Sequence, residues 1–188
     1  MNGLININDI KNGMTIIYDG KLYLIQSFLH VKPGKGAAFM KVKMRNLRTG
    51  ATIEETINSS VKVEKAHVEK KKMAYLYNSG TGYVFMDNET YEQTEISEDK
   101  LENEKKFLLE NMEVQIAFYQ GEIIGITLPE KVEYVVAETT EAVKGNTTNN
   151  AQKDATLENG LVVKVPLFIT EGERIIVSTE DGKYSSRA

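Results

Sequence analysis

The chain has 188 residues, of which 41% are hydrophobic and 27% are charged, so it can fold as one ordinary domain or as two to three small ones. It contains no cysteine, which excludes disulfides and thiol chemistry and fits a reducing compartment. With only His30 and His67 as histidines, we expect no histidine-based metal site. We also expect no cofactor.

The N-terminal segment lacks the basic start and the apolar stretch of a signal peptide. The longest apolar runs, such as residues 16–18, are far too short to span a bilayer. We therefore expect a cytoplasmic protein without a membrane partner.

The net charge of −4 is distributed unevenly along the chain. Residues 1–65 contain ten Lys and Arg against five Asp and Glu, residues 66–128 contain six against twelve, and residues 129–188 contain seven against ten. A basic first part followed by an acidic remainder suits a protein that touches phosphate with one end only. Random surface variation among three small domains is the alternative explanation.

Period-two alternation predicts strands in the first 65 residues. Asp19-Gly20 is typical of a tight hairpin turn, because these residues tolerate positive φ, and Thr49-Gly50 predicts a second turn of this kind. Several short strands in this length predict a small barrel or roll whose edges close on themselves. The predicted strands are residues 14–18, 21–31, 37–48 and 52–58.

A second set of strands follows in residues 66–128, with a helical segment inserted. Ser97 is a typical helix N-cap, and Glu98 and Asp99 follow it in the first turn, where the helix dipole favours anions. Five strands with one inserted helix predict an oligonucleotide/oligosaccharide-binding (OB) barrel. The predicted strands are residues 72–78, 83–86, 91–96, 114–119 and 123–128, and Leu101, Phe107, Leu108 and Met112 are expected on one face of the helical turns.

Pro129 marks the next boundary, and the remaining residues predict another small barrel. Residues 145–154 (GNTTNNAQKD) form a polar loop of ten residues, a length that is often functional. The predicted strands are residues 132–137, 161–165, 167–170, 174–179 and 184–187. We therefore predict an all-β chain with domains at residues 1–65, 66–128 and 129–188.

Motifs of common enzyme classes are absent from the sequence. The segment Pro33-Gly34-Lys35-Gly36 is not a GxxxxGK[ST] phosphate loop, because it lacks the upstream glycine spacing and the following Ser or Thr. No GxSxG motif exists, and pairs of acidic residues are expected to be solvated surface charge. We therefore expect no catalytic residue and no enzymatic activity.

The stretch HVKPGKGAAF at residues 30–39 places two lysines on a glycine-rich turn. Pro33 fixes φ, and Gly34 and Gly36 remove side-chain obstruction on both sides of Lys35. Such a thin turn can project the Lys35 ammonium into a narrow crevice lined with phosphates. Alternatively, it is a polar hairpin tip that lysine keeps solvated.

The strand predicted after this turn has a basic face. Lys41, Lys43 and Arg45 alternate along it, so their side chains point to the same side. This repeat favours contact with a phosphate backbone.

Several separate segments resemble the bacterial elongation factor P family, in the family's order and over essentially the whole chain. Residues 31–39 (VKPGKGAAF) resemble the tip of its N-terminal domain, and residues 153–172 resemble its C-terminal signature. Three shorter segments are also similar to the family: MAYLYN (73–78), FMDNETYEQ (85–93) and GKYSSR (182–187).

The resemblance implies both a fold and a function. The implied fold is an SH3-like (KOW-type) barrel followed by two OB-fold barrels, arranged in an L shape like tRNA. The implied function is to bind the 70S ribosome between the peptidyl and exit tRNA sites and to relieve stalling at consecutive prolines by positioning prolyl peptidyl-tRNA. The ribosome would perform the chemistry, and we expect the factor to be a monomer.

The resemblance also implies a role for Lys35. In the family, the lysine of the Pro-Gly-Lys-Gly segment is extended by a post-translational modification, which implies a lysine-modifying enzyme as a further partner. A lysine excludes the sugar that an arginine would carry here, and leaves a lysyl-type group, an aminopentanol-type group or no modification open. The residues that would shape the loop around Lys35 are Lys32, Pro33, Gly34 and Gly36.

Two further segments are assigned by resemblance. Tyr184 and Arg187 match the family's C-terminal pair that faces the small subunit and tRNA, with ordinary strand-end packing as the alternative. The segment Gly145-Asn146-Thr147 matches a loop that usually carries Gly-Asp-Thr in the family. Here Asn146 replaces the aspartate, and Asp154 replaces a usual proline. These two departures weaken the implied contact of the loop with exit-site messenger RNA. The residues assigned to ribosome or RNA binding are Lys41, Lys43, Arg45, Tyr184, Arg187, Gly145, Asn146 and Thr147.

Two other functions stay open from the sequence. One is an elongation-factor-P-like paralogue with a different ribosomal task, against which the intact lysine loop argues. The other is a general single-strand RNA-binding protein with OB barrels. Such barrels stack bases on aromatic side chains in a basic groove, whereas most aromatic residues here fall in acidic segments.

Overall fold

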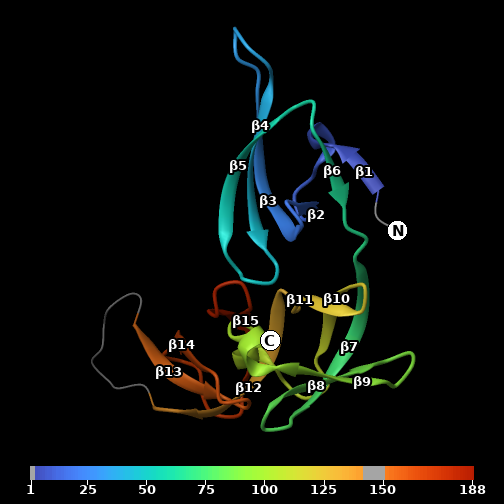
Figure 1. Cartoon of the computed structure of the whole chain (residues 1–188). Helices are drawn as coiled ribbons and strands as arrows, with labels where there is room; N and C mark the ends of the chain where they lie inside the picture. The colour runs from blue at the N-terminus through green and yellow to red at the C-terminus, as the bar shows by residue number, and fades with distance from the viewer. Residues whose placement is uncertain (1–2, 142–150) are drawn as a thin grey trace. The chain divides into compact units, whose positions relative to one another are not determined.

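The computed structural model describes residues 3–141 and 151–188 and shows an all-β chain (Figure 1). Its strands form three sheets, one of six strands and two of five. The chain separates into two compact units, which are described individually below. The first unit contains the residues up to Lys71 together with Ile116–Gly125, and the second contains Lys72–Gln115 and Ile126–Ala188.

The six-stranded sheet is built by the N-terminal part of the chain, in the order β1-β6-β2-β3-β4-β5. Alternation in β4 buries Met40, Val42 and Met44 in the core, as expected for a strand with one solvated face. The turn between β2 and β3 has positive φ at Asp19 and Gly20, as predicted. The elements are β1 (Gly3–Asn6), the 3-10 helix η1 (Ile7–Asp9), β2 (Thr15–Tyr18), β3 (Lys21–Val31), β4 (Phe39–Asn46), β5 (Thr52–Asn58) and β6 (Lys62–Lys65).

The middle sheet has the order β11-β10-β7-β8-β9. Tyr75 packs against Phe85 within it, with ring centroids 5.5 Å apart. Gly82 has no room for a side chain, because a Cβ there would lie 2.6 Å from the carbonyl oxygen of Ile96. The elements are β7 (Glu69–Asn78), β8 (Gly82–Asp87), β9 (Gln93–Ser97), two short 3-10 helices η2 (Glu98–Leu101) and η3 (Lys105–Phe107), β10 (Glu113–Tyr119) and β11 (Glu122–Thr127).

The third sheet has the order β14-β13-β12-β15-β16. Its core includes Tyr134, whose side chain is 0% exposed, and the ring of Phe107 from η3 packs into the same core. The Tyr134 hydroxyl donates a 2.5 Å hydrogen bond to the Phe107 carbonyl. The elements are β12 (Lys131–Thr139), β13 (Gln152–Leu157), β14 (Val162–Pro166), β15 (Arg174–Ser178) and β16 (Tyr184–Arg187).

The structure corrects several predicted elements. Residues 167–170 were expected to form a strand but form a turn, in which the Ile169 amide donates to the Pro166 carbonyl. The polar loop predicted over 145–154 ends earlier, because β13 begins at Gln152. The inserted helix is two 3-10 turns rather than one helix, and the Ser97 side chain makes no capping hydrogen bond. The short strands β1 and β6 were not predicted.

Candidate functional site

The predicted lysine loop lies at the end of a long β-hairpin arm. Strands β3 and β4 pair from Tyr23 with Asn46 up to Val31 with Phe39, and residues 32–38 connect them. Figure 1 shows this connection projecting beyond the other strands of its sheet. Residues 32–37 are all exposed, so the arm presents the loop to solvent.

Backbone geometry explains why glycine stands beside Lys35. Gly36 has φ +99°, in the left-handed region that side chains other than glycine rarely adopt. Gly34 has no such φ, and no atom lies within 4 Å of where its Cβ would be. Lys35 is exposed between them, and within the described residues its ammonium makes no ion pair or hydrogen bond. The side chain is therefore available to an external partner.

The base of the loop is tied to the chain that follows β5. The Ser59 amide donates a 3.0 Å hydrogen bond to the Ala38 carbonyl, and the Ser59 hydroxyl lies 3.5 Å from Nε2 of His30. The Asn8 side chain in turn donates to the Ser59 carbonyl at 3.2 Å. The arm is thus fixed at its root while its tip stays exposed.

Strand β4 carries the predicted basic face. Lys41, Lys43 and Arg45 are all exposed, between buried neighbours on the opposite face of the strand. Lys43 lies opposite Glu54 of β5, but none of the three basic residues makes an ion pair within the part of the chain that is described. The three charges therefore point to solvent on the same hairpin that ends in Lys35.

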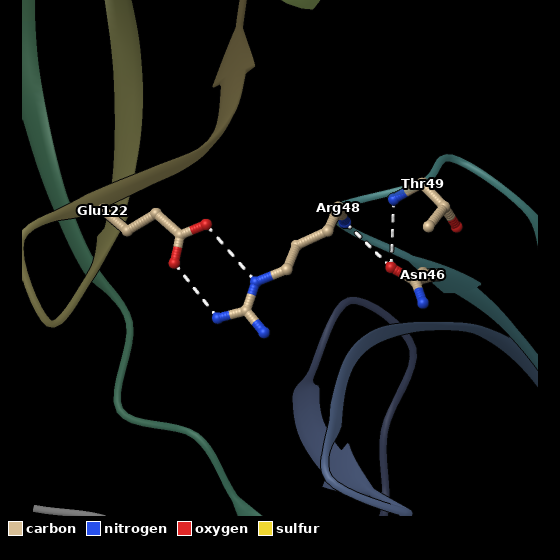
Figure 2. Close-up of polar contacts among 4 residues, drawn as sticks. All are labelled: Asn46, Arg48, Thr49 and Glu122. Carbon is tan, nitrogen blue, oxygen red and sulfur yellow. Dashed lines mark hydrogen bonds and ion pairs between the residues drawn. The ribbon is translucent and has the colours of Figure 1, made fainter.

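An ion pair that the sequence did not reveal lies within the first compact unit. The Nε and Nη2 atoms of Arg48 donate to the two carboxylate oxygens of Glu122 at 3.3 and 3.1 Å (Figure 2). The backbone of Arg48 is held by Asn46, whose Oδ1 accepts from the amides of Arg48 and Thr49 at 2.9 and 3.1 Å. The hydrogen bond that Arg48 donates to the Glu122 carboxylate raises the pKa of the Arg48 guanidinium. No local signal could have found this pair, because 74 residues separate its members.

The predicted C-terminal pair lies on β16, in the second unit. Tyr184 is half-buried and packs against the core of the third sheet, so its ring has a structural role. Arg187 is exposed. Its Nη2 donates to Glu173 at 2.9 Å, and its guanidinium lies 4.6 Å from the ring centroid of Phe168.

The remaining predicted contacts, Gly145, Asn146 and Thr147, lie outside the described residues. The strands that flank them are described. Lys153 is buried and its ammonium donates to the Thr140 carbonyl. Asp154 forms a 2.7 Å ion pair with Lys164. The Asp154 carboxylate therefore has a partner on the neighbouring strand β14.

Within residues 3–141 and 151–188, no group of three or more His, Cys, Asp or Glu side chains is placed to hold a metal ion. No helix in these ranges has the length and apolar character needed to cross a membrane.

Three protein-family models match successive parts of this chain. The elongation factor P (EF-P) KOW-like domain matches residues 6–63, and the elongation factor P OB domain matches residues 68–126. The elongation factor P C-terminal domain matches residues 132–187. The chain belongs to the elongation factor P family. This membership supports a role as a translation elongation factor.

Two solved structures are similar to this chain in fold. A eukaryotic translation initiation factor 5A from Methanococcus jannaschii is 26% identical, with a TM-score of 0.55, and the match covers 68% of this chain and 93% of that one. A translation initiation factor 5A family protein from Naegleria fowleri is 17% identical, with a TM-score of 0.51. This match covers 68% of this chain and 99% of that one, and it shows the fold alone. The KOW-like and OB folds predicted from the sequence are therefore confirmed.

Proposed function

We propose that this protein binds the 70S ribosome between the peptidyl and exit tRNA sites and promotes peptide-bond formation at consecutive prolines. The observation that carries the proposal is the exposed arm of β3 and β4, which ends in Lys35 between two glycines. A slender arm with an available ammonium at its tip suits a narrow site lined with phosphates. Membership in a family of translation factors supports the ribosome as the place of action.

The proposed mechanism is positional. The Lys35 side chain, extended by a lysine-modifying enzyme, would contact the terminal nucleotides of prolyl peptidyl-tRNA. Proline is a poor nucleophile in this geometry, and its rigid ring misplaces the nascent chain. Holding the reacting ends in alignment lowers the entropic part of the barrier, so the ribosome catalyses the reaction and the factor is not itself an enzyme. Such a factor would act in the cytoplasm, where ribosomes translate.

The basic face of β4 would support this placement. Lys41, Lys43 and Arg45 lie on the same arm as Lys35 and make no ion pair among the described residues, so they can neutralise tRNA or ribosomal RNA phosphates. Each contact with a phosphate releases counterions, and binding through this face would weaken as salt rises.

A site-directed crosslink tests the location of the loop. Because the natural chain has no cysteine, an Ala37→Cys variant carries one thiol two residues from Lys35, and a photoreactive group can be attached there. On ribosomes stalled with prolyl peptidyl-tRNA, we expect crosslinks to the 3′ end of that tRNA. A matched Lys21→Cys variant, exposed at the other end of β3, should not crosslink to it. Equal crosslinking from both positions, or none from position 37, would contradict the proposed location.

A further inference from the structure

Two side chains of the second unit, those of Phe168 and Glu173, contact the guanidinium of Arg187. The Arg187 guanidinium carbon lies 4.6 Å from the centroid of the Phe168 ring, a cation–π distance. Its Nη2 donates to Oε1 of Glu173 at 2.9 Å. The guanidinium is therefore held by a ring and by a carboxylate.

The two supports of Arg187 are themselves anchored. Phe168 is followed by Ile169, which is 0% exposed and whose amide donates to the Pro166 carbonyl at 3.2 Å. The second carboxylate oxygen of Glu173 accepts a 2.9 Å hydrogen bond from the Thr170 amide. The ring and the carboxylate therefore sit on one fixed turn rather than on a loose loop.

Arg187 is fixed at its backbone as well as at its head. It pairs with Ile175 across β15 and β16, and the next amide, of Ala188, donates to the Arg174 carbonyl at 3.0 Å. Yet the side chain of Arg187 is 55% exposed, and Phe168 is 57% exposed. A large aromatic ring held at the surface beside an arginine is not needed for the core of this barrel.

The head of Arg187 keeps hydrogen-bonding capacity for a ligand. A guanidinium has five N–H donors, and the described residues use one of them, for Glu173. An arginine held in place before binding loses less rotamer entropy when a partner arrives. Its planar, forked donors match the oxygens of an RNA phosphate.

We propose that Phe168 and Glu173 are positioning residues, which pre-organise Arg187 to contact an RNA phosphate of the ribosomal complex. This inference rests on the proposed function, because it takes ribosome-bound RNA as the partner. Phe168 acts through Arg187, so its contribution disappears when the arginine is removed.

A double-mutant cycle on binding to 70S ribosomes tests the proposal. We expect Phe168→Leu to weaken binding about two- to fivefold, the size of an exposed cation–π contact. Phe168→Tyr should restore binding, because it keeps an aromatic face. In an Arg187→Gln background, Phe168→Leu should have no further effect. Val162→Ala is the matched control, because Val162 is an apolar residue of the same sheet with a similar exposure of 56%.

Two further readouts separate positioning from folding and from other partners. In the free protein, the Nε proton of Arg187 should show a ring-current shift that Phe168→Leu abolishes, while the urea midpoint stays unchanged. The slope of log affinity against log salt concentration should fall by about one for Arg187→Gln if the partner is a phosphate. An unchanged slope would overturn the phosphate assignment.

The outcomes distinguish this inference from the function on which it rests. If wild-type protein does not bind the ribosome, the proposed function fails, and the inference fails with it. If the wild type binds but Phe168→Leu binds equally well, only the positioning role is wrong. If the effects of the two substitutions add, Phe168 contacts the partner directly, and that result also overturns the positioning role.

Discussion

Replacing Gly36 by alanine is expected to impair the lysine loop, whereas the same change at Gly34 is expected to be tolerated. Gly36 has φ +99°, and holding a residue with a Cβ in the left-handed region costs about 1–2 kcal/mol. Because 1.4 kcal/mol corresponds to a factor of ten, the observed loop conformation would become roughly 5- to 30-fold less populated. Gly34 has neither a positive φ nor a neighbouring atom within 4 Å, so its substitution lacks this cost.

The assay is synthesis of a peptide with three consecutive prolines, at a factor concentration below saturation. To reach the stimulation given by the wild type, we expect Gly36→Ala to need a roughly 5- to 30-fold higher protein concentration. For Gly34→Ala, we expect the required concentration to rise less than about twofold. Mass spectrometry of the Lys35 peptide should show the same modification state in both variants, so that a failure of the modifying enzyme is not mistaken for a change of conformation.

Equal loss of activity in both alanine variants, or full activity of Gly36→Ala, would contradict the expected need for a left-handed residue at position 36. Equal loss would mean that the loop needs flexibility at both glycines rather than a left-handed residue at one. Urea unfolding serves as the stability control. It should be unchanged in both variants, because the loop is exposed and contributes no core contact.

The remaining predictions concern the stability of the second unit. Tyr134→Phe leaves the Phe107 carbonyl without its hydrogen bond and is expected to lower the free energy of unfolding by about 1–3 kcal/mol, seen as a lower urea midpoint. Burial raises the pKa of Tyr134 above its ordinary value of 10.0, so the unfolded chain loses this proton more easily. Its contribution to stability is therefore complete below about pH 10 and falls as the pH rises further, and alkaline unfolding should be less steep in Tyr134→Phe. Gly82→Ala would place a Cβ 2.6 Å from the Ile96 carbonyl oxygen. It should lower the free energy of unfolding by about 1–3 kcal/mol. A urea midpoint equal to that of the wild type would contradict this prediction.

Alternation of residue types was the most informative signal for the strands. In β4, hydrophobic residues alternate with Lys41, Lys43 and Arg45, and the structure buries the first set and exposes the second. The strand could be predicted because alternate residues point to opposite faces of a sheet, and only one face of this sheet is solvated. The turn at Asp19 and Gly20 could be predicted for a similarly local reason, since few residues accept positive φ.

Errors arose where tertiary contacts override the local pattern. Ile169 lies in an apolar stretch that resembles a strand, but Pro166 ends β14, and Ile169 is buried from a turn. Strand β13 begins in a polar segment, because Gln152 and Asp154 face solvent there while Lys153 is buried with its ammonium on a backbone carbonyl. Strand β1 (GLIN) was missed because its two apolar residues are adjacent and its residues do not alternate between buried and exposed.

The candidate sites were predictable to different degrees. Lys35 could be singled out because the glycines and the proline around it form a recognisable local pattern. The partners of Arg187 could not, because Phe168 and Glu173 lie 19 and 14 residues earlier in the chain and become neighbours only through the pairing of β15 with β16. The ion pair between Arg48 and Glu122 could not be predicted either, because 74 residues separate its members in the sequence.

Lys35 is the residue that we propose lets this factor promote peptide-bond formation between prolines. The most direct measurement is the yield of a Pro-Pro-Pro peptide in a reconstituted translation system without factor, with protein purified from its own cells, and with its Lys35→Ala variant. We expect the native protein to restore synthesis and the Lys35→Ala variant not to restore it. If neither protein has an effect, the proposed role is contradicted and a paralogue with another ribosomal task is favoured. Equal restoration by both proteins would contradict the role of Lys35.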